Sequence, residues 1–460
     1  MSNRAYWLKS AFFTLFEKGS VFIFGFGSTF ILFRALTLQQ FGTWELFLAL
    51  VSFVEVGRVG LLQNALVKYL ATSEQQEYGV ISTASLVLNI ILSALSVLLI
   101  VSIAYPLSVY WDAPEIAVLL PIYAITTTLL IPFFQFNFIQ QGNFDFKGIF
   151  WSNFVRQFLF FSYVCFMYVS GREITLVGLA SWQVVTAAVG ALTAFIFGRK
   201  YLRFSRQLDW RWVRRLFAFG KYVFGTNLST MLYKSIDKIM LGTLLTPAAV
   251  ALYGTAIRIT NLADVPTNSI AAIVFPQSAK QMKERGADAI GRLYERSVGA
   301  ILAFLLPFLL VILIFPEFVI VTIASEKYLG AVPLLRLTIL YGLFMPFAVQ
   351  FGTVLDSIGR PRVNFYFTLL SALMNVVFNY LFITTYGVVG AAYGTLLTYG
   401  LMFVVMQTVL RRTMGVQFWR AFPNALMFYR EGFKMIRSYL QRGKLEGPIA
   451  SVEQTERELV

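Results

Sequence analysis

Charged side chains lie inside long apolar stretches of this sequence, where charges are rare and costly. Arg58 follows Glu55 by three residues, so both side chains share one face of a helix and can form an ion pair. Because a charge at the centre of a bilayer costs on the order of 3 kcal/mol, ionisable residues in such stretches are candidates for ligand binding. The candidate cations, which would bind an anionic ligand, are Arg34, Arg58, Arg156, Lys234 and Arg258.

Two carboxylates, Glu55 and Asp237, are candidates for ion coupling. Buried carboxylates can exchange protons or ions, and the alternative is that both are permanent counter-ions of the cations. Asp237 lies within one helical turn of Lys234 and Lys238. The sequence contains no G-x-x-x-x-G-K-[ST] nucleotide-binding motif, so we expect no cofactor and a gradient of H⁺ or Na⁺ as the energy source.

Each cation also has a structural interpretation. For the deepest ones the alternative is a permanent ion pair with Glu55 or Asp237. Arg34 and Arg156 fit a binding role and a structural role equally well. Side chains nearer the end of a span can extend to the membrane interface without any function. This last explanation suits Lys18, Lys221, Lys238 and Arg336.

Three prolines inside apolar stretches are candidate hinges. Proline removes a backbone donor and kinks a helix, so Pro132, Pro266 and Pro346 would let helices bend during transport. Pro132 and Pro346 begin two similar segments, PFFQF (132–136) and PFAVQF (346–351). The alternative is that the kinks only shape the helices.

Residue types that catalysis needs are scarce. The sequence has no histidine and one cysteine, Cys165, in the middle of an apolar stretch. The commonest zinc ligand and general base is therefore missing, and no intramolecular disulfide is possible. We expect no metal site. The loops expected outside the cell are short and carry only scattered acids, which argues against an enzyme.

The apolar stretches indicate an all-α polytopic membrane protein. With 58% hydrophobic and 13% charged residues, the chain is too apolar for a soluble domain of its length. A helix that spans a bilayer needs about 20 mostly apolar residues, which predicts about twelve transmembrane helices. The predicted spans are 10–36, 42–66, 80–104, 115–140, 149–170, 174–198, 217–243, 248–279, 298–323, 332–358, 363–384 and 388–410.

Basic residues indicate the orientation of these spans. Of the 38 lysines and arginines, only Arg172 and Lys327 lie in loops on one face of the predicted bundle. The positive-inside rule then places both termini in the cytoplasm and the chain in the inner membrane. The net charge of +15 follows from this topology, so we expect contacts with anionic membrane lipids and none with nucleic acid.

The second half of the chain repeats landmarks of the first half in the same order. Thr37 matches Thr246 at an offset of 209, and Gly142 matches Gly359 at an offset of 217. Six spans in each half make the halves parallel, which predicts a pair of six-helix lobes related by a pseudo-twofold axis. We expect an N-lobe at 1–198 and a C-lobe at 217–412. A basic cytoplasmic linker at 199–216 joins them, and Asp209 in this linker is expected to cap the next helix. Residues 413–460 are expected to form a cytoplasmic amphipathic helix and a polar tail.

Several segments resemble one known family. FRALTLQQFGTWELFLALVSFVEVGRVGLLQNALVKYLA (33–71) is similar to the family's first two helices, and DKIMLGTLLTPAAVALYGTAIRITN (237–261) to its seventh and eighth. Residues 269–280 and 356–400 fit as well. The chain thus resembles the O-antigen and exopolysaccharide (Wzx-like) flippases of the multidrug/oligosaccharidyl-lipid/polysaccharide (MOP) exporter superfamily.

The resemblance implies alternating access to a central cavity between the lobes. The substrate would be an undecaprenyl-diphosphate-linked oligosaccharide, whose phosphate oxygens arginines can bind bidentately. Polysaccharide polymerase and chain-length proteins are implied partners, and the protein is expected to be a monomer. The main alternative function is that of a MATE-like cation-coupled multidrug antiporter. A third possible function is that of a membrane enzyme of the same polysaccharide pathway.

Overall fold

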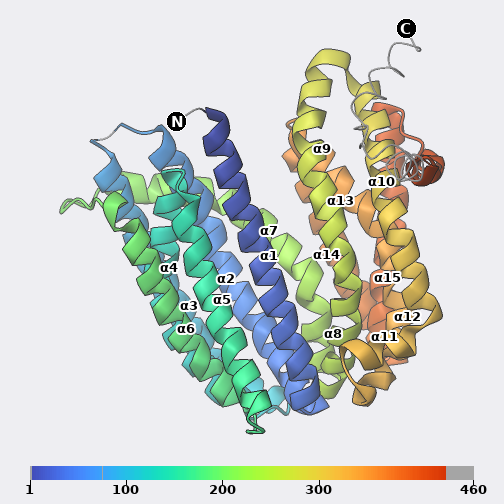
Figure 1. Cartoon of the computed structure of the whole chain (residues 1–460), viewed down its shortest axis with the longest axis horizontal. Helices are drawn as coiled ribbons and strands as arrows, with labels where there is room; N and C mark the ends of the chain where they lie inside the picture. The colour runs from blue at the N-terminus through green and yellow to red at the C-terminus, as the bar shows by residue number, and fades with distance from the viewer. Residues whose placement is uncertain (1–2, 75, 431–460) are drawn as a thin grey trace, which may run out of the picture. The chain divides into compact units, whose positions relative to one another are not determined.

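Helices make up all the regular structure of the part of the chain that the structure describes. A computed structural model describes residues 3–74 and 76–430, and no strand occurs among them (Figure 1). Helices satisfy their own backbone groups, as lipid requires, so the predicted all-α class is confirmed. The elements are α1 Asn3–Ala35, α2 Leu38–Thr72, α3 Tyr78–Tyr110, α4 Ile116–Gly142, α5 Phe146–Val169, α6 Leu176–Gly198, η1 Arg199–Tyr201, α7 Trp210–Leu244, α8 Pro247–Thr260, η2 Asn261–Ala263, α9 Asp264–Arg285, α10 Ala287–Ile314, α11 Pro316–Ile323, η3 Glu326–Ala331, α12 Val332–Thr338, α13 Tyr341–Ser357, α14 Pro361–Tyr386, α15 Val388–Met414 and η4 Phe418–Arg420.

Each predicted span falls on one or two of these helices. By length and apolar composition, seven helices of the described chain could cross a membrane, or eight if one bent pair counts as a single span. The chain is therefore a multi-pass membrane protein, but the predicted number of about twelve spans is not confirmed by this measure. Helices α2 and α7 are among those outside the seven, and both carry several charged residues.

Side-chain caps start the helices where the sequence repeats its landmarks. Thr37 caps α2 in a capping box with Gln40, each side chain accepting a hydrogen bond from the other residue's backbone N–H, at 3.2 and 3.0 Å. Thr246 precedes α8 and accepts from the Ala249 N–H at 3.3 Å. The predicted cap of the seventh span is confirmed, because the Asp209 carboxylate accepts from the Arg211 N–H at 2.8 Å.

The two halves of the chain differ in where their helices break. The predicted span 248–279 is divided by η2 into α8 and α9, directly before Asp264. Pro266 lies in the first turn of α9, where a missing N–H costs no helical hydrogen bond. Glu326–Thr338 and α13 meet at a bend of 52° that lies before Pro346, whereas α4 continues as one α-helix through Pro132.

The first compact unit comprises Met1–Ala256, Glu317–Leu334 and Thr368–Gly394. Within it, α2 and α7 pack closely along their lengths because small residues face the neighbouring backbone. A Cβ added at Gly220 of α7 would lie 1.9 Å from the Leu61 carbonyl oxygen of α2. A Cβ at Gly42 would lie 1.7 Å from the Pro247 carbonyl oxygen. Such approaches allow the backbone-to-backbone packing that associates helices in lipid.

The second compact unit comprises Ile257–Pro316, Leu335–Phe367 and the chain from Thr395 onward. Its core contains α9, α10 and α13, and Tyr294 of α10 is fully buried there. The Tyr294 hydroxyl donates to the Phe347 carbonyl at 3.2 Å and accepts from the Gln407 amide at 2.8 Å. Because the hydroxyl is satisfied on both sides, a polar atom is tolerated in an apolar core.

The predicted linker begins with η1 at the end of α6. Lys200 pairs with Asp145, the N-cap of α5, at 2.8 Å, and the Tyr201 hydroxyl donates to the same carboxylate at 3.1 Å. Burial alone would raise the pKa of Asp145, but the hydrogen bonds from Lys200 and Tyr201 outweigh it and lower the pKa below its ordinary value. The linker is thereby fastened to the end of α5.

The division into an N-lobe and a C-lobe follows from the sequence repeat and stays a prediction. Residues 421–430 are helical, as expected for the start of the amphipathic segment. The rest of that predicted helix and the polar tail, residues 431–460, lie outside the described residues.

We expect Gly220→Ala to destabilise the protein. The added methyl group would overlap the Leu61 carbonyl, and relief requires α2 and α7 to separate, at a cost of about 1–3 kcal/mol. Gly25→Ala is the matched control, because a Cβ at Gly25 meets nothing within 4 Å. Thermal unfolding in detergent micelles would show a lower Tm for Gly220→Ala alone. Equal Tm values for both variants would contradict the close packing of α2 on α7.

Candidate functional site

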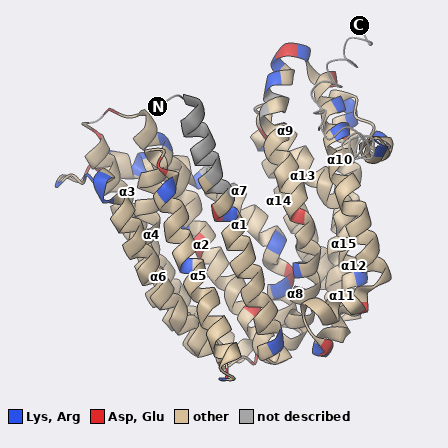
Figure 2. Ribbon diagram, in the orientation of Figure 1, with Lys and Arg blue, Asp and Glu red and all other residues tan. Residues whose placement is uncertain are grey.

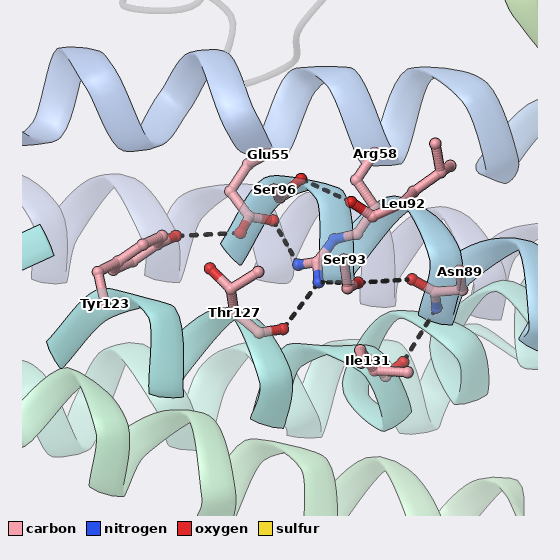
Figure 3. A network of polar contacts seen from close by, with 9 residues as sticks. All are labelled: Glu55, Arg58, Asn89, Leu92, Ser93, Ser96, Tyr123, Thr127 and Ile131. Atoms are coloured by element: carbon pink, nitrogen blue, oxygen red, sulfur yellow. Dashed lines mark hydrogen bonds and ion pairs between the residues drawn. The ribbon is translucent and has the colours of Figure 1, made fainter. Parts of the chain in front are cut away.

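A buried ion pair stands at the centre of α2, α3 and α4, and Figure 3 shows its contacts. The Arg58 Nη2 atom lies 2.7 Å from Glu55 Oε2, and Arg58 Nη1 donates to Ser93 Oγ at 3.0 Å and to the Thr127 carbonyl at 2.8 Å. The Tyr123 hydroxyl donates to the other Glu55 oxygen at 3.1 Å. We call these five residues the Arg58 network.

The surroundings of Arg58 explain how the membrane interior holds a guanidinium. Arg58 is 2% exposed, and its guanidinium carbon lies 4.8 Å from the centre of the Phe134 ring. The Thr127 carbonyl of α4 accepts a hydrogen bond from Arg58, which brings a third helix into the contacts of the guanidinium. The geometry thus matches the ion pair that the sequence left as the alternative for Arg58. A phosphate reaching Arg58 would have to replace Glu55.

Arg156 has different surroundings from Arg58. It is half-buried on α5, with its guanidinium carbon 5.1 Å from the centre of the Phe133 ring. Gly190 of α6 leaves room beside its side chain, since a Cβ added there would lie 3.4 Å from the Arg156 Cβ. Within residues 3–74 and 76–430, Arg156 forms no hydrogen bond or ion pair.

Asp237 of α7 sits in a second buried polar cluster. Its two carboxylate oxygens accept from the Tyr253 hydroxyl and the Asn379 amide, each at 2.5 Å, and Asn379 also donates to Asn375 at 3.0 Å. Asp237 is 5% exposed and both asparagines are fully buried. The hydroxyl and amide groups therefore help to stabilise the Asp237 carboxylate.

The adjacent Lys238 pairs with a residue that sequence reasoning missed. Its Nζ atom lies 2.6 Å from Glu45 Oε2, and Glu45 has no exposed surface. Lys238 was expected to reach the interface, but its partner on α2 keeps it in the bundle. The signal was present in the sequence, because Glu45 is a charge inside the predicted span 42–66.

The remaining predicted residues lie in varied surroundings. Lys234 is exposed on α7 and Arg258 is half-buried near the end of α8. Figure 2 shows how few charged residues interrupt the mostly uncharged helices. Arg34 caps the end of α11, donating to the carbonyls of Thr322 at 2.7 Å and Ile323 at 3.0 Å. This contact favours a structural role for Arg34, because the carbonyls at a helix C-terminus attract cations.

Metal ligands do not gather in the described chain. No group of three or more His, Cys, Asp or Glu residues lies close enough to hold a metal ion there. Cys165 is a free, partly buried thiol.

The fold is shared with solved transporters. The structure matches a multidrug resistance MATE family transporter of the MOP superfamily in its inward-facing conformation with a TM-score of 0.74, at 17% identity, covering 86% of this chain and 94% of that one. It matches the lipid II flippase MurJ in an inward closed conformation with a TM-score of 0.73, at 13% identity, covering 93% of each chain. At these identities the likeness shows only that the chain shares the fold of these two proteins.

The sequence itself identifies the family. The family model of polysaccharide biosynthesis proteins matches residues 31–333, more than half of the chain. The chain therefore belongs to the polysaccharide biosynthesis protein family, as the resemblance implied. A curated relative is the probable low-salt glycan biosynthesis flippase Agl15 of Haloferax volcanii, 23% identical over 205 residues, which are 45% of this chain and 43% of the relative. The chain spans about half the length of the curated relatives it first matches.

Breaking the ion pair in the Arg58 network should destabilise the protein. We expect Arg58→Met to cost about 3 kcal/mol, because Glu55 would be left as a poorly compensated charge in the bundle. Adding Glu55→Gln should restore part of the loss, since the unpaired charge is removed. Unfolding free energies in mixed micelles measure both effects.

The control for this cycle is Lys280→Ala. Lys280 pairs with Glu284 at 3.9 Å on an exposed surface, where a pair contributes within about 0.5 kcal/mol. If the double variant lost as much stability as the two single variants together, Arg58 and Glu55 would be energetically independent.

Proposed function

We propose that the protein is a flippase that moves an undecaprenyl-diphosphate-linked oligosaccharide across the inner membrane by alternating access, for the synthesis of a surface polysaccharide. Membership of the polysaccharide biosynthesis family and the MOP-type fold support this proposal. Further support comes from relatives whose names describe a glycan biosynthesis flippase and a lipid II flippase. Both termini would lie in the cytoplasm.

The observation that carries the proposal is the set of contacts around the Arg156 guanidinium. A half-buried guanidinium beside an aromatic ring, without a carboxylate partner in the described chain, has donors available for a ligand. The diphosphate is the part of the substrate that lipid excludes most strongly, and arginine binds phosphate oxygens through paired N–H groups. Arg156 would therefore be the main phosphate contact on the first unit.

The other predicted cations take lesser parts in this proposal. Arg58 would contact phosphate only if Glu55 gave it up, and Arg34 would stay in its structural contact with α11. Lys234 and Arg258 are proposed to line the path of the sugar-diphosphate. Glu55 and Asp237 are proposed to couple transport to H⁺ or Na⁺.

Helix breaks supply the proposed hinges. The 3₁₀ segment before Pro266 and the bend before Pro346 are proposed points of flexing in the second half, with Pro132 as their first-half equivalent. Two lobes, 1–198 and 217–412, would move as bodies about them. Membrane lipids, and polymerase or chain-length proteins of the same pathway, would be the partners of a monomeric flippase.

Arg156→Ala should slow translocation by about tenfold or more, because hydrogen bonds to charged groups contribute about 1.5–3 kcal/mol each. A polyprenyl-diphosphate oligosaccharide with a terminal galactose is loaded into proteoliposomes, and its exposure to external galactose oxidase is followed. Arg172→Ala is the control, since Arg172 lies exposed in the loop after α5. Arg156→Lys tests geometry, because a lysine keeps the charge and loses the paired donors.

The outcomes separate the proposed flippase from its alternative. A wild type that moves no lipid-linked sugar but expels a cationic dye would make the protein a multidrug antiporter. Normal sugar transport by Arg156→Ala would keep the flippase and remove Arg156 from the phosphate site.

A further inference from the structure

The contact face between α3 and α4 is polar although both helices are strongly apolar. Ser82, Ser85, Asn89 and Ser93 follow one another on α3 at spacings of three, four and four, so they share one helical face. Each of them is at most 1% exposed. Mean hydropathies of 2.7 for α3 and 2.1 for α4 show how unusual this stripe is for its surroundings. No part of the proposed function uses it.

The stripe is hydrogen-bonded across to α4 at regular intervals. Ser85 Oγ donates to the Gln135 side chain at 3.3 Å, and the Gln135 amide donates to the Ser82 carbonyl at 3.3 Å. The Asn89 amide donates to the Ile131 carbonyl at 3.2 Å. These distances are longer than those of typical strong hydrogen bonds. We call this face, with Ser82, Ser85, Asn89 and Ser93 on one side and Thr127, Ile131 and Gln135 on the other, the α3–α4 seam.

The seam joins the Arg58 network directly. Ser93 Oγ accepts from Arg58 and lies 3.5 Å from Asn89 Oδ1, and the Thr127 carbonyl accepts from Arg58 at the same level (Figure 3). Polar side chains therefore follow one another on this face of α3, one in each turn, from the Glu55–Arg58 pair to Ser82. Ser82 lies in the first turns of α3, at the end that the charge rule assigns to the cytoplasm.

Several buried atoms along this line have no hydrogen-bond partner among the described residues. They include Arg58 Nε, Thr127 Oγ1 and Ser82 Oγ. Leaving a buried polar group unpaired costs about 1–3 kcal/mol, and such groups in folded proteins are ordinarily bonded to ordered water. The unpaired atoms lie at the two ends of the seam, where they suit bound water molecules.

We propose that the α3–α4 seam is a hydrated proton route that connects Glu55 with the cytoplasmic end of α3. The inference rests on the proposed function in that it gives transport its coupling ion. A protonated Glu55 would pass its proton to a water in the seam, leaving a carboxylate paired with Arg58, and the proton would move past Ser93, Asn89 and Gln135 to the cytoplasm. The arrangement in the structure, with the ion pair formed, is the state after release.

The charged groups around Glu55 suit such an exchange. Arg58 on its own helix stabilises the carboxylate, and Tyr123 of α4 donates to it. Arg156 of α5 acts electrostatically on Tyr123, and α3 carries no charged residue between Tyr78 and Tyr110. Helix α7, which also packs on α2, carries seven charged residues: Arg211, Arg214, Arg215, Lys221, Lys234, Asp237 and Lys238. The Glu55 oxygens bond to Arg58 and Tyr123, and no group of three or more His, Cys, Asp or Glu residues gathers in the described chain, so the seam favours a proton over a metal ion.

Infrared spectroscopy in nanodiscs tests the route without any sugar substrate. The protonated-carboxyl band that Glu55→Gln removes is assigned to Glu55, and its decay is followed after a jump from acidic to neutral pH. We expect Asn89→Leu to slow this decay about tenfold. The substitution removes one hydrogen-bonding group from the route, and the free energy of about one hydrogen bond corresponds to about a tenfold change in rate. Asn89→Ser should restore part of the rate. Ser93→Ala replaces Asn89→Leu as the blocking variant if the latter does not insert.

Ser96→Ala is the matched control on the same helix. Among the residues that the structure describes, Ser96 bonds only to the Leu92 carbonyl of its own helix, so the decay should stay as in the wild type. Equal decay rates in the wild type, Asn89→Leu and Ser93→Ala would overturn the proton route. So would a Glu55 band that follows Na⁺ concentration at constant pH. If proton exchange behaves as expected while the galactose assay shows no flipping, the flippase proposal fails and the route stands.

Discussion

The cost of a charge in a low-dielectric interior governs the arrangement of this protein. Arg58 is buried among apolar helices, and its guanidinium is tolerated only because Glu55, Ser93 and Thr127 bind it from three directions. Those three residues belong to α2, α3 and α4, so satisfying one charge sets the relative register of three helices. The same requirement pairs Lys238 with Glu45 and surrounds Asp237 with hydroxyl and amide donors.

Close packing supplies the second constraint. Because lipid tails are as apolar as the helix surfaces, there is little hydrophobic driving force for helices to associate in a membrane. Helix contacts therefore depend on small residues and interhelical hydrogen bonds. Gly220 and Gly42 bring backbones to distances that no side chain permits, and Glu45, on the α2 segment that follows Gly42, pairs with Lys238 of α7. Polar pairing and glycine packing therefore support each other, since the short interhelical distance brings Lys238 within reach of Glu45.

The two halves of the chain differ in the continuity of their helices. First-half helices α2 and α4 are continuous and carry the buried Arg58 network. Their second-half counterparts are divided, by η2 between α8 and α9 and by the bend between α12 and α13. The buried polar network therefore joins continuous helices of the first half, whereas the breaks divide helices of the second half. The equivalent prolines show why sequence position alone does not predict bending: α4 continues as one α-helix through Pro132, whereas a bend of 52° lies before Pro346.

The sequence alone determined the class of this protein, because the length and apolarity of its stretches leave helices in a membrane as the only fold. It also determined the family, the caps at Thr37 and Asp209, and the list of unusual charges. It did not determine which charges were paired. Glu55 and Arg58 were visible as neighbours on one helix, but Lys238 and Glu45 are far apart in the chain, and Asn379 gives no sequence signal that it bonds Asp237. Only the tertiary structure showed that Arg58 and Arg34 are engaged in internal hydrogen bonds. It also showed that Arg156 lies beside the Phe133 ring and has no carboxylate partner among the described residues. The reason is physical: composition decides whether a residue is costly to bury, whereas the helices that pack around it decide what compensates that cost.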